Sequence, residues 1–388
     1  MKTRIIKPEK IIKKYRDREI YLGTSFFKEL NQIISKYPNN LVITDQIIYE
    51  QVAKDCLKDA AEILPAQIKA SKAIALEISH KLQNFDYAIA IGSGTINDLV
   101  KYAAHQANKP YIVFATAPSM NGYFSENASL ITDNIKQSHK ANPPLHAYFD
   151  LDILANAPTR LIQSGLGDSI CSTICRADWL LSHYLLDTNY DELPFDLTYE
   201  LENKLYQQSS KLLDKDKEAV ALLTEILIMS SLGMTYCGSS EPASQGEHML
   251  AHYYELLDPE ISHQSFHGEQ IAVTSQHMLK IQEKILKSAP PTLKARTLPK
   301  LPDGTSKAKP DLDITHANQQ LKTIWPELGD AINQKYRSQT EILNTLKQAR
   351  IKTTPVELGW NQNIYKTITN QAFLTRDRFT FLDLEFYS

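Results

Sequence analysis

"YAIAIGSGTINDLVKYAAHQANKPYIVFAT" (Tyr87–Thr116) contains two short apolar runs on either side of a longer segment with helical periodicity. The runs Tyr87–Gly92 and Tyr111–Thr116 are rich in aliphatic and aromatic residues and have the length of buried strands. The segment between them, Thr95–Ala107, predicts a helix. A strand, a helix and a second strand at this spacing form a βαβ unit, in which the two strands are parallel. The stretch therefore predicts an α/β fold with a mostly parallel sheet.

The same alternation continues on both sides of this unit. Upstream, "NLVITD" (Asn40–Asp45) predicts a strand that is followed by a helix over residues 47–61. Downstream, "NASLIT" (residues 127–132) and "HAYFDL" (residues 146–151) predict two further strands. The first part of the chain is therefore expected to be an α/β domain.

The pattern changes after Pro158, where apolar residues recur three and four positions apart and strand patterns almost disappear. We therefore expect two domains, an α/β domain over residues 1–158 and an all-α domain over residues 159–388. The segment Ser288–Asp311 contains five prolines and few residues to bury. It is expected to be a surface loop or a poorly ordered excursion within the second domain.

The composition is that of a globular protein without a nucleic-acid-binding surface. Of the 388 residues, 43% are hydrophobic and 22% are charged, and the net charge is −3 without a basic block, so no nucleic-acid partner is expected. The apolar stretch Ala219–Cys237 carries Glu225 and predicts a buried core helix without membrane insertion. Four cysteines are too few for a disulfide framework, and the basic N-terminus lacks the apolar core of a signal peptide, which favours a cytoplasmic location.

Two glycines lie between the first strand and the helix of the βαβ unit. Glycine permits a tight turn and the close approach of a phosphate, and the free N–H groups of a helix N-terminus attract an anion. The spacing Gly92-x-Gly94-x-x-Asn97 lacks the third glycine of the dinucleotide fingerprint, and no acidic residue follows about 20 positions later. The available acid is Asp45, at the end of an earlier strand, where it could hold a ribose hydroxyl. A plain strand-to-helix turn remains the alternative, but a second polar turn at Thr116–Ser125 supports a nucleotide site.

The segment Ser244–Gln270 contains four of the eleven histidines of the chain, namely His248, His252, His263 and His267. Such a cluster suggests metal binding or proton transfer. His248 and His252 are four residues apart in a helical pattern, so their side chains share one face. Asp168, which follows glycines near the predicted domain boundary, is the available acidic ligand. One carboxylate and two imidazoles suit a divalent cation such as zinc or nickel with an open coordination position.

Each of these residues also has a structural alternative. His248 and His252 could be hydrogen-bonded helix histidines, and Asp168 could be a helix N-cap. Glu269 either orients the neighbouring histidine or is a surface acid. Three further candidates are expected to have no role at the cation, namely His263 as an exposed loop residue and Cys171 and Cys175 as small buried helix residues.

Five motifs occur in one order over most of the chain: "GSGTINDLVKY", "TAPSMNGYFS", "SGLGDSICSTICRADW", "GEHMLAHYYE" and "FHGEQIAV". Together they resemble the sn-glycerol-1-phosphate dehydrogenases, a branch of the superfamily of iron-containing alcohol dehydrogenases and dehydroquinate synthases. The resemblance implies a dehydroquinate synthase-like two-domain architecture, with a nucleotide-binding α/β domain and a helical metal- and substrate-binding domain. It also implies a metal-dependent, NAD(P)H-linked interconversion of dihydroxyacetone phosphate and sn-glycerol 1-phosphate, a homodimer, and a role in the synthesis of phospholipid backbones.

The same resemblance assigns residues by motif. It implies that Asp168, His248 and His267 are the metal ligands, and that His252 contacts the substrate or relays a proton. Asp168, His252 and Asn121 would form the substrate site, with Asp168 and His252 in catalytic roles. NAD(H) or NADP(H) would be held by residues of the predicted turns, namely Asp45, Gly92, Ser93, Gly94, Thr95, Ile96, Thr116, Ser119 and Ser125. The charge of Asp45 would repel a 2′-phosphate, which favours NAD over NADP.

Some positions depart from the family pattern. Asn121 stands where the family commonly has an acid, which keeps open another small polyol, aldehyde or phosphorylated ketone as substrate. The gap from His248 to His267 is also slightly longer than expected. Ser172 occupies the place of a histidine ligand in the iron-type alcohol dehydrogenases, and Asp168 the place of a glutamate in dehydroquinate synthase-like lyases, so neither branch is favoured. A metal- or nucleotide-binding protein without turnover is the remaining alternative, and the intact ligand set argues against it.

Overall fold

The computed structural model describes residues 3–55, 57, 61–132, 135–302, 305–307, 309 and 312–388. The chain forms two compact units. Unit 1 contains Met1–Gly165 and Glu200–Gly238, and unit 2 contains Leu166–Tyr199 and Ser239–Ser388. Each unit therefore consists of two separate segments of the chain.

These units differ from the two continuous segments 1–158 and 159–388 expected from the sequence. Glu200–Gly238 groups with unit 1 because helix α9 (Lys217–Cys237) is bonded to a loop of that unit. The Ser231 hydroxyl accepts a hydrogen bond from the Phe124 N–H at 2.9 Å, and the Thr235 hydroxyl donates to the Phe124 carbonyl at 3.0 Å. A boundary at residue 158 between independently folding domains stays a prediction.

The described residues of unit 1 form a seven-stranded sheet in the order β1-β2-β9-β6-β5-β3-β4. Its strands are β1 (Arg4–Ile6), β2 (Glu19–Gly23), β3 (Asn40–Asp45), β4 (Glu62–Leu64), β5 (Tyr87–Gly92), β6 (Tyr111–Ala115) and β9 (His146–Asp150). Only the β1–β2 pair is antiparallel. The predicted mostly parallel sheet is thus confirmed.

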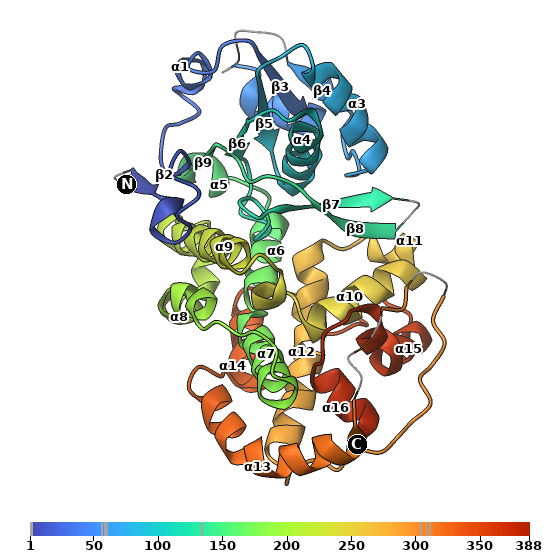
Figure 1. The fold of residues 1–388 in the computed structure, drawn as a ribbon. Coiled ribbons are helices and arrows are strands. Elements are labelled where there is room, and N and C mark those ends of the chain that lie inside the picture. Colours follow the sequence, from blue (N-terminus) through green and yellow to red (C-terminus); the bar gives the residue numbers. More distant parts are fainter. Residues whose placement is uncertain are drawn as a thin grey trace. The chain divides into compact units, whose positions relative to one another are not determined.

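The central strands are buried on both faces, which explains their continuous apolar runs. Every residue from Ala88 to Ile91 in β5 and from Ile112 to Ala115 in β6 is inaccessible to solvent. Helix α4 (Gly94–Ala107) packs against β5 and β6, and helix α3 (Lys72–Leu82) lies beside α4 (Figure 1). The predicted βαβ unit is therefore confirmed.

Other elements of unit 1 differ in part from the prediction. The helix expected over residues 47–61 is a short helical segment, α2 (Gln46–Ile48) followed by a π-helical turn (Tyr49–Ala53), and residues 56 and 58–60 lie outside the described part. Strand β7 (Asn127–Thr132) forms a separate antiparallel hairpin with β8 (Ile135–Lys140).

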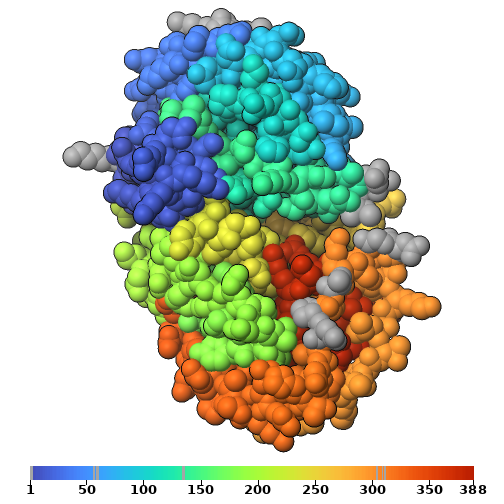
Figure 2. Space-filling view, viewed as in Figure 1, coloured from blue at the N-terminus to red at the C-terminus, as the bar shows by residue number. Residues whose placement is uncertain are grey.

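The chain after β9 contains no strand in its described residues, which agrees with the helical pattern. The helices up to α9 are α5 (Leu151–Leu154), α6 (Thr159–Ser169), α7 (Ser172–Leu186) and α8 (Leu193–Tyr206). Those that follow are α10 (Gly246–Leu257), α11 (Pro259–Ser262), α12 (His267–Leu286), α13 (Ile314–Asn333), α14 (Gln339–Gln348), α15 (Gln362–Gln371) and α16 (Phe381–Tyr387), with short 3₁₀ turns at Ser209–Leu212, Glu241–Ala243 and Ala372–Thr375. Part of the red C-terminal segment reaches the surface in the view of Figure 2.

The described residues of the proline-rich segment Ser288–Asp311 form neither helix nor strand, as expected. The segment is nevertheless attached to unit 2, because Asn318 accepts a hydrogen bond from the Leu293 N–H at 2.7 Å. Farther along, Lys309 forms an ion pair with the buried carboxylate of Asp383 at 2.7 Å. Residues 303, 304, 308, 310 and 311 lie outside the described part.

Helix α9 is the one described helix that is long and apolar enough, by length and composition, to cross a membrane. Core helices of globular proteins meet the same criterion, so this is weak evidence for a membrane span. Of its most apolar window, 67% is buried within the protein. The burial agrees with the predicted core helix.

Candidate metal centre

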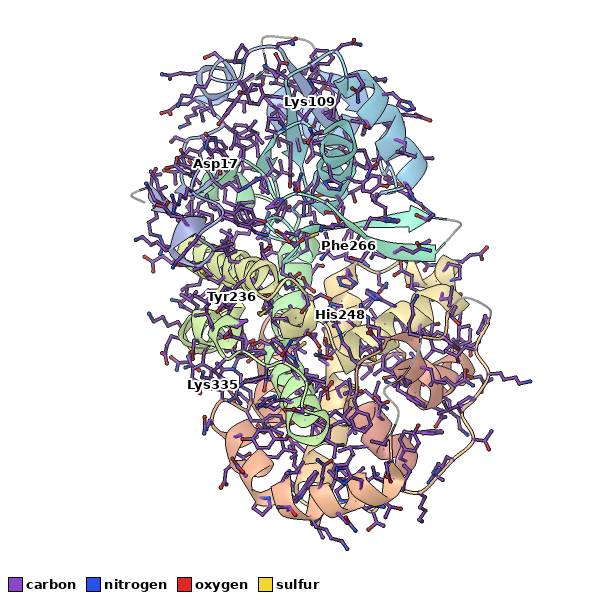
Figure 3. The ribbon with its side chains drawn as sticks, in the orientation of Figure 1. Asp17, Lys109, Tyr236, His248, Phe266 and Lys335 are labelled. Atoms are coloured by element: carbon purple, nitrogen blue, oxygen red, sulfur yellow. The ribbon has the colours of Figure 1, made fainter. Side chains whose placement is uncertain are left out.

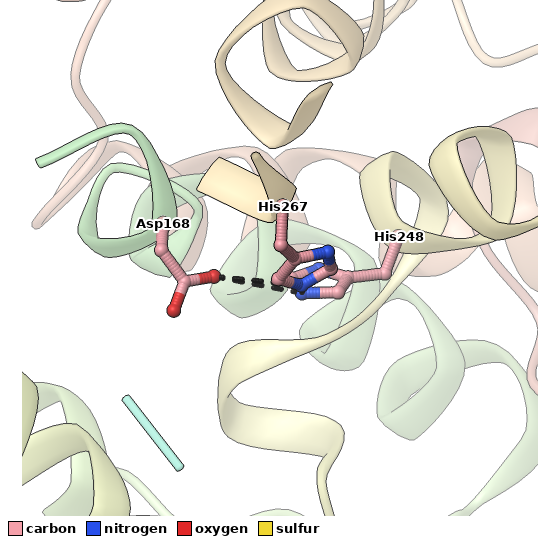
Figure 4. Close-up of side chains that lie close together, drawn as sticks. All are labelled: Asp168, His248 and His267. Carbon is pink, nitrogen blue, oxygen red and sulfur yellow. Dashed lines mark hydrogen bonds and ion pairs between the residues drawn. The ribbon is translucent and has the colours of Figure 1, made fainter. Parts of the chain in front are cut away.

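Three side chains from three helices of unit 2 point toward one another (Figure 4). Asp168 Oδ1 lies 3.8 Å from both His248 Nε2 and His267 Nε2, and the two Nε2 atoms are 3.3 Å apart. A point equidistant from three atoms with these separations lies about 2.1 Å from each, within the usual range of zinc–nitrogen and zinc–oxygen bonds. The carboxylate and His248 are buried, and His267 is partly exposed. The residues therefore fit a divalent cation.

The imidazole of His248, which projects from α10 (Figure 3), is oriented by the preceding residue. Glu247 Oε1 lies 2.6 Å from His248 Nδ1 and also accepts a hydrogen bond from the Gln245 N–H at 2.9 Å. Burial acts to raise the pKa of Glu247, but the His248 contact and the backbone N–H bond hold it below its usual value. A charged carboxylate accepts the Nδ1 proton and leaves the Nε2 lone pair facing the other two ligands. The sequence reasoning did not identify Glu247.

Gly167 permits a close approach of the ligand-bearing helices α6 and α12. A Cβ atom on Gly167 would lie 2.2 Å from the carbonyl oxygen of Gly268, which is closer than any side chain tolerates. Gly167 directly precedes Asp168, and Gly268 directly follows His267. The absence of a side chain at Gly167 thus lets the backbone beside Asp168 approach the backbone beside His267.

Glu269 caps a helix, and His263 lies at the surface. Glu269 Oε2 accepts a hydrogen bond from the Phe266 N–H at 2.7 Å, at the N-terminus of α12. The carboxylate therefore caps the helix that carries His267. His263 is exposed in the turn after α11, as the sequence predicted.

His252 lies beside the three candidate ligands. Its ring stacks on that of His267, with centroids 5.5 Å apart and an interplanar angle of 22°. His252 Nδ1 also lies 3.2 Å from Arg376 Nη2. A guanidinium can only donate, so Nδ1 must be the acceptor and the proton of a neutral imidazole is on Nε2. In this tautomer the Nε2–H group can donate a hydrogen bond to a bound molecule.

Cys171 and Cys175 are both buried, as predicted, and with Glu247 they form a second group of close ligand-type atoms. The Cys175 thiol lies 3.2 Å from Glu247 Oε1. Burial raises the pKa of Cys175 well above its usual value. Cys175 is therefore a thiol that donates a hydrogen bond to Glu247, and it supports the acid that orients His248.

In unit 1, the first predicted nucleotide turn joins β5 to α4. A Cβ atom on Gly92 would lie 2.6 Å from the Ile96 side chain, and one on Gly94 would lie 2.7 Å from the Met120 sulfur. The first hydrogen bond of the helix runs from the Asn97 N–H to the Ser93 carbonyl at 3.0 Å. The N–H groups before Asn97 are those that a helix leaves without a partner inside its own first turn. This geometry suits a phosphate.

Polar groups at the carboxyl ends of β3 and β6, the two strands that flank β5, support a ligand there. The hydroxyls of Thr44 and Thr116 are buried and have no hydrogen-bond partner in the described part of the chain. A buried polar atom without a partner is costly unless a ligand or water satisfies it. Asp45, at the end of β3, accepts a hydrogen bond from the Ile48 N–H at 2.9 Å and so caps α2. A contact of Asp45 with a ribose stays a prediction.

The second predicted turn is held by a lysine that the sequence reasoning did not identify. The ammonium of Lys101, in α4, is fully buried and donates to the main-chain oxygens of Gly122 and Asn127, the latter at 3.1 Å. It also lies 3.8 Å from Asp98, and burial lowers the pKa of Lys101 to about 8. In the sequence, Asp98 and Lys101 are a charged pair three residues apart in a mostly apolar helix, and this pair could have indicated the buried lysine.

The remaining residues of this turn are also placed within unit 1. Ser125 is buried, and its hydroxyl is within hydrogen-bond distance of the Gly122 and Asn127 carbonyls, each at 3.0 Å. The Ser119 carbonyl accepts from the Ser164 hydroxyl at 3.3 Å. Asn121, Ser119 and Ser125 therefore belong to a turn that internal bonds hold, and their contacts with cofactor or substrate stay predictions.

The chain is similar to known dehydrogenases. The family described as iron-containing alcohol dehydrogenase matches residues 23–158. The glycerol-1-phosphate dehydrogenase (NAD(P)+) of Sulfurisphaera tokodaii is 31% identical over 330 residues, which cover 81% of this chain and 91% of that protein. The protein of the same name from Halalkalibacterium halodurans is 36% identical over 171 residues, covering 44% of this chain and 43% of the relative.

A solved structure shows the same fold. The structure of a probable glycerol dehydrogenase from Sinorhizobium meliloti has a TM-score of 0.67 and 14% sequence identity, and the match covers 95% of this chain and 94% of that chain. The predicted fold class, a mostly parallel α/β region followed by a helical region, is thereby confirmed.

Proposed function

Since the chain belongs to the iron-containing alcohol dehydrogenase family as an NAD(P)-dependent, glycerol-1-phosphate dehydrogenase-like oxidoreductase, we propose that it interconverts dihydroxyacetone phosphate and sn-glycerol 1-phosphate. The observation that carries the proposal is the convergence of Asp168, His248 and His267 in unit 2. Relatives that are about 30% identical over most of the chain bear the name of this activity. The phosphorylated ketone is accordingly the substrate to test first.

Asp168, His248 and His267 would hold the divalent cation, for which zinc and nickel are our candidates. When bound, such a cation supplies Lewis-acid polarisation of the substrate carbonyl. Glu247 keeps the His248 imidazole in the tautomer that can act as a ligand.

The nicotinamide cofactor supplies the hydride. The turn from Gly92 to Ile96 would hold its pyrophosphate, and the unpartnered hydroxyls of Thr44 and Thr116 would bond to it. Asp45 would favour NAD over NADP through charge repulsion of a 2′-phosphate.

His252 would contact the C2 oxygen of the substrate. The Arg376 contact leaves the proton of the neutral imidazole on Nε2, so this N–H would donate a hydrogen bond that orients the oxygen, while a bound water would supply the proton when the ketone is reduced and take it up in the reverse direction. Asn121 would contact the substrate from the turn after β6.

We also propose that the protein is a homodimer in the cytoplasm and that it supplies the backbone of ether or ester phospholipids. Light scattering tests the dimer.

The decisive experiment combines metal analysis of the purified protein with NADH and NADPH oxidation on dihydroxyacetone phosphate. We expect about one divalent cation per chain and turnover that chelation abolishes. Treatment of the product with an enzyme specific for sn-glycerol 3-phosphate should leave it unchanged.

The alternative substrate class, motivated by Asn121, is tested in the same assay. Dihydroxyacetone, glycerol and short aldehydes are compared with dihydroxyacetone phosphate by kcat/KM. A higher value for an unphosphorylated compound would replace the proposed substrate. Nicotinamide binding without turnover of any compound would support a binding protein.

A further inference from the structure

Two arginines approach each other in the segment between the 3₁₀ turn Ala372–Thr375 and α16. Arg376 and Arg378 both donate to the carbonyl oxygen of Ser244, and Arg378 Nη2 also donates to the Ser240 hydroxyl at 3.0 Å. A shared acceptor places the two guanidinium groups next to each other, close to the N-terminus of α10.

This pair lacks a carboxylate partner in the described part of the chain, unlike Arg176 and Arg337 of unit 2. Arg176 forms an ion pair with Glu192 at 2.8 Å, and Arg337 forms one with Glu341 at 3.2 Å. No ion pair joins Arg376 or Arg378 to a described carboxylate, although Glu241, Asp377 and Glu247 act on them from farther away.

Two adjacent cations in a partly buried place repel each other. Burial and the neighbouring Arg378 lower the pKa of Arg376 to about 9, and burial lowers the pKa of Arg378 as well. Both side chains keep some exposure to solvent, so a solute can reach them. A bound anion would relieve the repulsion and use the free donors of both planar groups.

The pair is one imidazole away from the candidate metal centre. Arg376 Nη2 lies 3.2 Å from His252 Nδ1, and the His252 ring stacks on His267 with centroids 5.5 Å apart. In dihydroxyacetone phosphate, one methylene and one ester oxygen separate the carbonyl carbon from the phosphorus. A small phosphorylated ketone with its carbonyl at the metal centre therefore has its phosphate within reach of the arginines.

We propose that Arg376 and Arg378 bind the phosphate of the substrate and give the enzyme its preference for phosphorylated over unphosphorylated ketones. The inference rests on the proposed function, because it takes that substrate as its ligand. Arg376 also holds His252 in the tautomer that carries its proton on Nε2, so one side chain would bind the phosphate and orient the imidazole toward the substrate.

Arg378→Gln is the most direct test, since Arg378 has no contact with His252. The quantity to measure is the ratio of kcat/KM for dihydroxyacetone phosphate to kcat/KM for dihydroxyacetone. Loss of a charge-assisted contact to phosphate should lower this ratio about 10- to 100-fold. Arg378→Lys keeps the positive charge on a long side chain, so this variant is expected to fold and to lower the ratio by a smaller factor. Arg296→Gln is the matched control, because Arg296 is exposed and also donates to a main-chain carbonyl, that of Ser388 at 2.8 Å.

A binding measurement complements the kinetics. Inorganic phosphate should raise the midpoint of thermal unfolding of the wild-type protein and of Arg296→Gln, and it should do so less for both Arg378 variants. An unchanged ratio together with unchanged phosphate protection in a folded Arg378 variant overturns the inference and leaves the proposed function intact. Absence of wild-type turnover on dihydroxyacetone phosphate, by contrast, overturns the proposed function itself.

Discussion

Replacement of Glu247 by glutamine should weaken metal binding without a change in the three ligands. The Glu247 carboxylate is completely buried, and its Oε1 lies 2.6 Å from His248 Nδ1. Glutamine keeps the size and one oxygen of the side chain but removes the charge that makes His248 a better donor to a cation. It also introduces an amide NH₂ group, which favours the opposite tautomer of the imidazole if it faces Nδ1.

The magnitude follows from the burial of this contact. Loss of a carboxylate that orients a histidine ligand typically lowers metal affinity about 10- to 100-fold, or by about 1.4 to 2.8 kcal/mol. The Glu247 side chain is shielded from water and shares its oxygen with the Gln245 N–H and the Cys175 thiol. We therefore expect the upper half of this range, about 30- to 100-fold.

The assay is competition for zinc between the metal-free protein and a chromophoric chelator at neutral pH, with circular dichroism to verify folding. Glu269→Gln is the matched control, because Glu269 lies next to the ligand-bearing end of α12 but its carboxylate caps the helix through the Phe266 N–H. The control should lose about 1 kcal/mol of stability and less than about threefold in zinc affinity. Equal losses in the two variants, or wild-type affinity in a folded Glu247→Gln protein, would refute the orienting role.

Three further changes test other parts of the structure. Gly167→Ala places a Cβ 2.2 Å from the Gly268 carbonyl oxygen. It should lower the free energy of unfolding, measured in urea, by about 1 to 3 kcal/mol or more, and it should weaken zinc binding. In the control Gly329→Ala the new Cβ meets nothing within 4 Å, so the stability should be unchanged or higher. Lys101 has its pKa lowered to about 8 in the folded protein, below the unfolded value of about 10.4, so the folded state binds fewer protons between these values. The free energy of unfolding of the wild type relative to Lys101→Met should therefore rise from about pH 8 to pH 10; a flat or falling difference contradicts the assignment. His267→Ala should fold, bind zinc poorly and retain less than about 1% of wild-type turnover; a near-normal rate would remove it from the candidate ligands.

Local patterns predicted the elements at the centre of the sheet. Strands β5 and β6 are buried on both faces, so each is a short, continuous apolar run that predicts a strand by itself. The helix between them begins at Gly94 and ends before Asn108. Strand β2 was missed because Glu19–Gly23 is short and follows a charged segment, and its conformation is set by pairing with β9 far along the chain.

Local patterns likewise predicted some residues of the candidate site and missed others. Asp168, His248 and His267 stand in motifs that made them candidates, because ligand residues are chosen by chemistry that the sequence displays. Lys101 and Glu247 left a faint signal, a charge inside a helix that is otherwise mostly apolar. Arg376 left none, because its partner His252 is 124 residues away in the chain.

By itself, the sequence determined the alternation of strands and helices and the helical second half, and it named three candidate ligands whose side chains converge in the structure. These properties depend on periodicity and residue chemistry within short windows. The tertiary structure alone decided that Glu200–Gly238 joins unit 1, that Glu247 orients His248, and that two arginines meet beside His252. The physical reason is that a local pattern specifies which face of an element is buried, while the partner on that face is selected by packing and hydrogen bonding between distant segments.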